Sequence, residues 1–271
     1  MDTKLPWPFY TEPKWIDVHG LKTAYRREGA GEPVLYLHGN GMTRRWLPFY
    51  EELSRSVDLI VPDHPGFGDT EMPEWLDNFS DVVLHYAELL DTLGLEKVHV
   101  IGHSFGGWIA AEFASFYPER LKSLQLLTPA GLKGANLHDS FRQSGEEALE
   151  RIFNGGADKY AEYTDDGDPT ESLISNYKQQ TTVARLAWQP RHNIKLPRRL
   201  GRVTAPTQVI LPDEDRILNA DVMRKYAEYI PGATLASISN PDAPTSHVPF
   251  VQAPKALAEM LSGFVAAASK D

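Results

Sequence analysis

The alternation of short apolar runs with longer helical patterns limits most strongly how this chain of 271 residues can fold. Two alternating segments, 14–18 and 21–26, flank His19-Gly20 and predict a β-hairpin. Further apolar runs, rich in β-branched residues, have the length of buried strands. They lie at 34–37, 57–61, 98–101, 124–127, 207–211 and 234–238. Strands that alternate with helices predict an α/β fold with a mostly parallel sheet covered on both faces.

One long stretch breaks this alternation. Between about Ala130 and Gly201 the pattern contains helical pieces but no convincing strand. We therefore predict an insertion between two strands of the sheet. The chain would consist of an α/β core, residues 1–129 and 202–271, and a helical cap, residues 130–201. A core of about 200 residues agrees with the size of α/β domains.

The sequence Gly-His-Ser-Phe-Gly at 102–106 fits the pattern G-x-S-x-G. It follows the predicted strand at 98–101 and opens a predicted helix at Phe105, and this context gives the motif its meaning. A serine on a sharp strand-to-helix turn occupies a strained backbone conformation, and small residues beside it allow close packing. The pattern predicts that Ser104 projects above the sheet as a nucleophile.

A second turn, His38-Gly39-Asn40-Gly41, follows the predicted strand at 34–37. A glycine-rich turn in this position can present backbone N–H groups to an anion. Acyl transfer needs such donors for the tetrahedral oxyanion, and we expect them to be the amides of Asn40 and Phe105. The sequence leaves open whether Asn40 or Gly41 is the donor from this turn.

A serine hydroxyl needs a base to take its proton, and the base needs an acid to orient it. His247 is the best base, because it lies in the loop between the last apolar strand and the final helix. The segment 212–216 follows another strand and offers three carboxylates. We choose Asp215 as the acid and keep Asp213 as the alternative. The order Ser104, Asp215, His247 is that of α/β-hydrolase triads.

Composition restricts the chemistry further. The chain has no cysteine, which excludes a thiol nucleophile and thiolate metal sites. With 37 acidic and 27 basic residues the net charge is −10, which argues against nucleic-acid or anionic-membrane partners. No metal or nucleotide motif is present, so we expect no cofactor. The N-terminal segment lacks a signal-peptide pattern and no run is long enough to span a membrane, so we expect a cytoplasmic protein.

With these residues identified, the chain resembles the α/β-hydrolase superfamily, in its cap-bearing serine-hydrolase branch. The resemblance runs from about Trp15 to the final helix. It rests on the motifs HGNG (38–41), PDHPGFGDT (62–70), GHSFGG (102–107) and YPERLKSLQLLTPAGL (117–132), and on the segment 207–218 with the final histidine loop. It implies an eight-stranded, mostly parallel sheet, a cap over about 130–200, and Ser104, Asp215 and His247 as the triad.

These features predict a serine hydrolase that cleaves a small carboxylic ester or a related acyl compound, with carbon–carbon bond hydrolysis as the second choice. We expect Gly41, His103, Trp188 and Val248 to line the substrate pocket. A basic run that begins at Arg191 could bind a substrate carboxylate, although a solvated face is the better interpretation. Alternatives are an acyltransferase, a hydroxynitrile lyase or a cofactor-free oxygenase on the same scaffold, and a small-molecule receptor that keeps the triad. The oligomeric state stays open.

Overall fold

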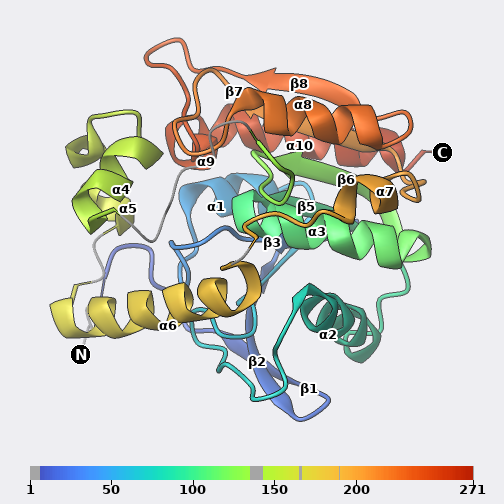
Figure 1. The fold of residues 1–271 in the computed structure, drawn as a ribbon, viewed down its shortest axis with the longest axis horizontal. Coiled ribbons are helices and arrows are strands. Elements are labelled where there is room, and N and C mark those ends of the chain that lie inside the picture. The colour runs from blue at the N-terminus through green and yellow to red at the C-terminus, as the bar shows by residue number, and fades with distance from the viewer. Residues whose placement is uncertain (1–6, 135–142, 165–166, 189, 271) are drawn as a thin grey trace.

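A single sheet of eight strands forms the centre of the molecule (Figure 1). The computed structural model describes residues 7–134, 143–164, 167–188 and 190–270. The strand order is β1-β2-β4-β3-β5-β6-β7-β8, and only the pairs β1–β2 and β2–β4 are antiparallel. The strands are β1 (Lys14–Val18), β2 (Leu21–Glu28), β3 (Pro33–Leu37), β4 (Asp58–Pro62), β5 (Val98–His103), β6 (Leu121–Leu127), β7 (Thr207–Pro212) and β8 (Thr234–Ile238). The prediction of an eight-stranded, mostly parallel sheet is confirmed.

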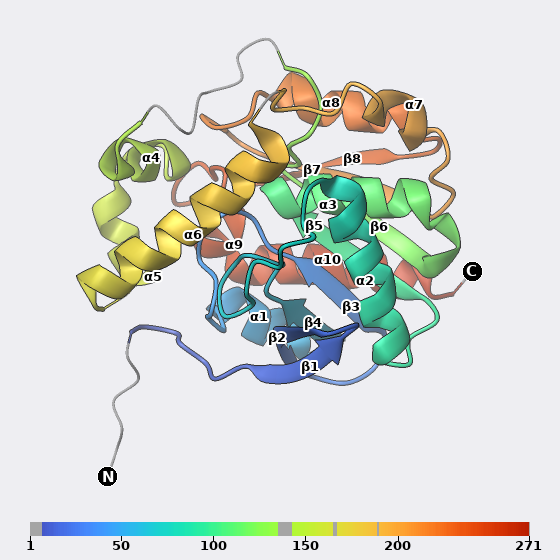
Figure 2. The ribbon, with the colours of Figure 1, turned by 60° about the horizontal axis from the view of Figure 1, so that its bottom comes forward.

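Helices cover both faces of the sheet (Figure 2). One face packs against α2 (Phe79–Thr92), α3 (Ser104–Phe116) and α8 (Ala220–Tyr229). The other packs against α1 (Pro48–Ser54) and α10 (Pro254–Ala268), which also contact each other. Because side chains alternate along a strand, β3 contributes Leu35 and Leu37 to the first core and Val34 and Tyr36 to the second.

The chain between β6 and β7 contains no strand in the residues that the structure describes. It contains α4 (Gly145–Ile152), α5 (Ala161–Thr164), α6 (Pro169–Ala187) and α7 (Leu196–Leu200), with a 3-10 turn at Ala157–Tyr160. In Figure 2, α4, α5 and α6 gather on one side of the molecule, whereas α7 packs on α3 and α8. The division into a core and a cap at 130–201 stays a prediction.

Side chains of α6 hold that helix against loops of the sheet. Lys178 Nζ donates to Gly68 O (3.2 Å), Thr182 Oγ1 donates to Gly66 O (3.0 Å), and Arg185 Nη2 donates to Glu74 O (3.1 Å). A short helix, α9 (Pro249–Gln252), precedes α10. The parallel strands β3, β5, β7 and β8 end at one edge, so the loops that follow them meet there.

Candidate active site

Ser104 lies at the junction of β5 and α3 in a left-handed backbone conformation, with φ of +51°. Non-glycine residues rarely adopt this conformation, so the turn stores strain. Glycine is required two residues later, since a Cβ on Gly106 would lie 2.1 Å from Leu37 O and 2.3 Å from His38 O. The close approach of α3 to β3 fixes the turn and leaves the Ser104 side chain partly exposed.

A continuous hydrogen-bonded chain joins Ser104, His247 and Asp215. His247 Nδ1 lies 2.7 Å from Asp215 Oδ2, and His247 Nε2 lies 2.8 Å from Ser104 Oγ. A carboxylate only accepts hydrogen bonds, so Nδ1 carries the proton and Nε2 is left to accept from the serine hydroxyl. The histidine and aspartate side chains are 6% and 2% exposed, so little water competes for these bonds. The structure thus brings together three residues that lie far apart in the sequence.

The remaining oxygen of Asp215 is also held. Its Oδ1 accepts the backbone N–H groups of Ile217 (2.7 Å) and Leu218 (2.8 Å), which orients the carboxylate toward the histidine. Asp213, the alternative acid, binds groups other than His247. Its oxygens accept from Ser239 Oγ (2.6 Å) and from the backbone N–H of Thr245 (2.9 Å). Burial alone would raise the pKa of Asp213, but these hydrogen bonds outweigh it and lower the pKa.

The backbone of the His247 loop is fixed from below by His103. The His103 Nε2–H donates to His247 O (2.9 Å). Burial, followed by the neighbouring His247, lowers the pKa of His103 well below its ordinary value, so the ring stays neutral. On the other side, Gln252 Oε1 accepts both the N–H and the hydroxyl of Ser246, at 2.5 and 2.9 Å. His103 therefore holds the backbone of the loop that carries His247.

The turn after β3 presents one backbone amide toward α6. Gly41, with φ of +94°, donates its N–H to Gln179 Oε1 at 3.2 Å. In the described part of the chain, the N–H groups of Asn40 and Phe105 have no acceptor. That of Phe105 lies in the first turn of α3, where helical N–H groups have no partner within the helix. Within the described residues, the amides of Asn40 and Phe105 are thus unpaired, and both stay predicted oxyanion donors.

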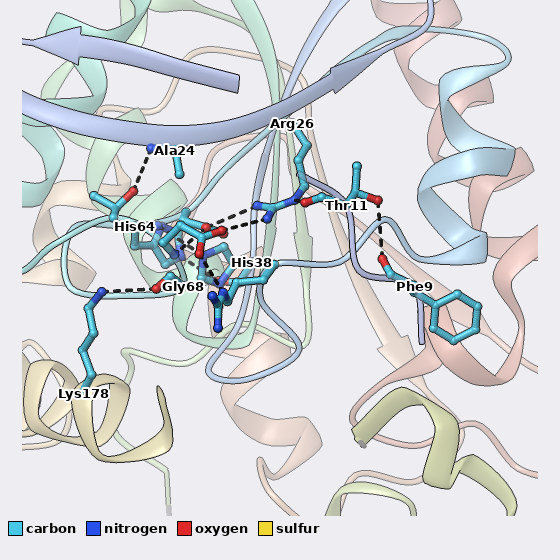
Figure 3. A network of polar contacts seen from close by, with 12 residues as sticks. Phe9, Thr11, Ala24, Arg26, His38, His64, Gly68 and Lys178 are labelled. Atoms are coloured by element: carbon cyan, nitrogen blue, oxygen red, sulfur yellow. Dashed lines mark hydrogen bonds and ion pairs between the residues drawn. The ribbon is translucent and has the colours of Figure 1, made fainter. Parts of the chain in front are cut away.

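Two stacked histidines lie beneath this turn (Figure 3). His38 Nε2 accepts the backbone N–H of His64 (3.2 Å), and its Nδ1–H donates to Gly39 O (2.7 Å). The Nε2–H of His64 donates to His38 O (2.8 Å), and its Nδ1 accepts from the Tyr86 hydroxyl. Burial lowers the pKa of both rings, which agrees with these neutral tautomers. The pair holds the turn in place.

A buried ion-pair network continues from these histidines. Arg26, whose side chain is 2% exposed, donates to Asp63 Oδ2 (3.2 Å) and to Asp69 Oδ2 (3.0 Å). Asp69 also pairs with Arg44, at 2.7 Å. Figure 3 shows Lys178 reaching from α6 to Gly68 in the same region. The network joins β2, the loop after β4 and α6, and so stabilises the surroundings of the turn.

A cavity with about 420 Å³ of empty space, part of it open to solvent, lies beside Ser104. Three of the predicted pocket residues, Gly41, His103 and Val248, line it. The fourth, Trp188, directly follows α6, is 53% exposed and is not among the residues that line this cavity, so its role stays a prediction. The other lining residues are Tyr36, His38, Gly39, Asn40, Met42, Leu47, Tyr50, Ser104, Ile152, His247 and Phe250.

Sequence reasoning missed most of these residues, in particular Tyr36 and Tyr50. None of the lining residues carries a carboxylate, ammonium or guanidinium group. The basic run does not reach the cavity, and Arg199 instead pairs with the buried Glu112 (3.0 Å).

Within the described residues, no group of three or more His, Asp or Glu side chains is arranged to hold a metal ion. No helix among them is long and apolar enough to cross a membrane.

Comparison with known proteins agrees with this architecture. The family model for the alpha/beta hydrolase fold matches residues 32–155. A 2-hydroxy-6-oxo-6-phenylhexa-2,4-dienoate hydrolase of Burkholderia cepacia is 30% identical over 229 residues, which are 76% of this chain and 79% of that protein. Lipase 1 of Psychrobacter immobilis is 27% identical over 256 residues, 86% of this chain and 77% of the lipase. The chain belongs to the α/β-hydrolase family.

A solved structure shows the same fold over nearly the whole chain. A bacterial membrane phospholipase A superposes with a TM-score of 0.81 at 22% identity, covering 97% of this chain and 88% of the phospholipase. Other curated relatives are 33–37% identical, but this chain spans only 33–43% of their length. These comparisons identify the family and the fold of the chain.

Proposed function

We propose that this protein is a serine hydrolase that cleaves a small, uncharged carboxylic ester through an acyl-enzyme on Ser104. The observation that carries the proposal is the chain from Ser104 Oγ to His247 Nε2 (2.8 Å) and from His247 Nδ1 to Asp215 Oδ2 (2.7 Å). A nucleophile within hydrogen-bonding distance of a base, and a base oriented by a third group, is the arrangement that acyl transfer needs.

In the proposed reaction, Ser104 Oγ attacks the ester carbonyl while His247 Nε2 takes the hydroxyl proton. Asp215 stabilises the imidazolium that forms, since its carboxylate is already oriented by two backbone amides. The imidazolium then returns the proton to the alcohol as it leaves. Water, activated in turn by His247, attacks the acyl-enzyme, releases the acid and restores Ser104.

The tetrahedral intermediate carries a negative charge, which needs two donors close to Ser104. We assign this role to the N–H groups of Asn40 and Phe105. The hydrogen bond of the Gly41 N–H to Gln179 supports Asn40 as the donor from this turn. The position of Ser104 supports this assignment as well. The serine has a positive φ and begins α3, and the free N–H groups at the start of a helix favour negative charge.

The absence of a cation among the described residues of the cavity lining favours neutral substrates. A substrate carboxylate in this cavity would lose its hydration without gaining a charged partner, which is costly. Carbon–carbon bond hydrolysis is the second candidate, because the Burkholderia cepacia relative is named as a dienoate hydrolase. The two candidates share Ser104 and differ in the charge of the substrate.

Turnover of p-nitrophenyl esters and of vinylogous diketo acids by the wild-type protein and by Ser104→Ala tests this proposal. We expect turnover of neutral esters that falls to background in the variant. Wild-type turnover by Ser104→Ala would contradict it. Activity on diketo acids alone would select the second candidate. Analysis of the products would identify acyl transfer, hydroxynitrile lysis or oxygen chemistry. A ligand that raises the melting temperature without being turned over would identify a receptor.

A further inference from the structure

Two tyrosines, Tyr36 on β3 and Tyr50 on α1, line the cavity beside Ser104. They are only 1% and 3% exposed, and their rings meet edge to face with centroids 5.1 Å apart. Much of the remaining lining is apolar and includes Leu47, Ile152 and Phe250. A pair of phenol hydroxyls in such surroundings is unusual, because burying a polar group is costly unless it finds a partner.

The hydrogen-bonding capacity of the pair is only partly used. The two hydroxyls interact with each other, and neither makes a hydrogen bond to any other described residue. Two hydroxyls carry two hydrogens, and a bond within the pair uses one of them. The second hydrogen therefore has no acceptor in the described protein. Burial raises the pKa of both tyrosines, so both hydroxyls keep their hydrogens at ordinary pH.

We propose that Tyr36 and Tyr50 form a subsite that donates a hydrogen bond to a neutral oxygen of the substrate, an ether or a carbonyl oxygen remote from the scissile carbonyl. The inference rests on the proposed function, because it places this oxygen in the cavity that contains Ser104. It narrows the substrate class to short esters whose acyl or alcohol chain carries one uncharged acceptor. A charged acceptor fits less well, since no lysine or arginine lines the cavity.

Esters that differ only in one chain atom test this subsite. In the first pair, p-nitrophenyl 4-methoxybutanoate replaces one methylene of p-nitrophenyl hexanoate by an ether oxygen. In the second pair, 3-ethoxypropyl acetate replaces one methylene of hexyl acetate, which places the oxygen on the alcohol side. We expect the ether ester of at least one pair to have a kcat/KM about three- to tenfold higher, the usual effect of one hydrogen bond. A wild-type protein without this preference in either pair would overturn the proposal.

Removal of the hydroxyls should abolish the preference in steps. Tyr36→Phe and Tyr50→Phe each leave one hydroxyl with a free hydrogen, so each single variant should keep part of the preference. The double variant has no donor, and its ratio of ether ester to methylene ester should fall to about one. Tyr226→Phe is the control, because this buried hydroxyl donates to Ala130 O and does not line the cavity. A double variant that keeps the wild-type ratio would contradict the subsite.

A binding measurement separates this inference from the proposed function. Ser104→Ala protein should bind the ether ester of the preferred pair about three- to tenfold more tightly than its methylene partner, whether or not the wild type hydrolyses either. Preferential binding without hydrolysis would support the subsite and refute the proposed function. Hydrolysis of all four esters, with equal affinities within each pair, would support the proposed function and refute the subsite.

Discussion

The side-chain oxygen of Gln179 in α6 accepts a hydrogen bond from the backbone N–H of Gly41, across 138 positions of sequence. The distance is 3.2 Å, and the other end of the Gln179 amide donates to Ser175. This bond connects α6 directly to the turn that carries Asn40. It also engages one of the two amides that the sequence left as alternatives for the oxyanion.

Loss of this acceptor should therefore reduce catalysis. Gln179→Met keeps the length of the side chain but leaves the Gly41 N–H without its partner, so the turn loses a restraint next to Asn40. We expect kcat to fall about tenfold with a smaller change in KM, because a misplaced oxyanion donor affects mainly the transition state. Thr181→Val, on the exposed side of the same helix, is the control. An equal effect of both variants would indicate a general loss of α6 structure.

The two neighbouring carboxylates after β7 should behave differently. Asp215→Asn removes the acceptor that orients His247, and we expect kcat to fall about 10³- to 10⁴-fold with the protein folded. Asp213→Asn weakens the bonds to Ser239 and Thr245, and we expect a lower melting temperature with kcat reduced less than about tenfold. Steady-state kinetics and thermal denaturation of both variants check this. A larger kcat effect at Asp213 would reverse the assignment.

Close packing at the Ser104 turn predicts a strong effect of one methyl group. Gly106→Ala places a Cβ against two backbone carbonyls of the Leu37–His38 segment, which cannot move aside easily. We expect the free energy of unfolding to fall by more than about 3 kcal/mol. Gly263→Ala, in α10, meets nothing within 4 Å and should stabilise the protein by about 0.5–1 kcal/mol. Urea denaturation measures both, and a mild effect at Gly106 would contradict the tight contact.

His85 in α2 should make the protein sensitive to acid. Neither ring nitrogen has a hydrogen-bond partner in the described residues, and burial lowers its pKa from 6.5 to about 4. Below pH 6.5 the unfolded chain takes up a proton that the folded chain does not, so stability falls as the pH falls. Because of this pKa difference, His85 lowers the free energy of unfolding by about 2 kcal/mol when the pH falls from 8 to 5.

His85→Leu removes this titration while keeping a buried side chain of similar size. The difference in free energy of unfolding between the variant and the wild type should shift in favour of the variant by about 2 kcal/mol from pH 8 to pH 5. Urea denaturation at both pH values measures this shift. A difference that does not change with pH would show that folding leaves the pKa of His85 at its ordinary value, and this would contradict the lowered pKa.

Sequence patterns were sufficient for the sheet because its central strands β3, β4 and β5 are buried and appear as apolar runs, whereas β1 and β2 show the alternation of a hairpin. The predicted run at 98–101 became β5, which extends to His103, since its last residues are a glycine and a histidine that an apolar pattern does not include. The strand–turn–helix context likewise indicated the conformation of Ser104. The order of the motifs along the chain brought His247 and Asp215 into consideration, and the structure places both beside Ser104.

The cavity could not be predicted in the same way. Tyr36 lies within an apolar strand and resembles a core residue, and only the packing of α1 places Tyr50 against it. Nothing in the sequence connects Gln179 with Gly41, because their contact depends on where α6 rests. Trp188 is an aromatic residue of the insertion, but it directly follows the end of α6, and the buried residues of that helix are Gln179, Thr182 and Ala187.

Labelling by a fluorophosphonate tests the central claim most directly. An activated serine reacts with this probe, whereas an ordinary serine does not, since its hydroxyl is a weak nucleophile. Mass spectrometry of the labelled and digested protein should show one modified serine, Ser104, and His247→Ala should abolish the labelling. An unlabelled wild-type protein, or labelling that survives loss of His247, would contradict the account.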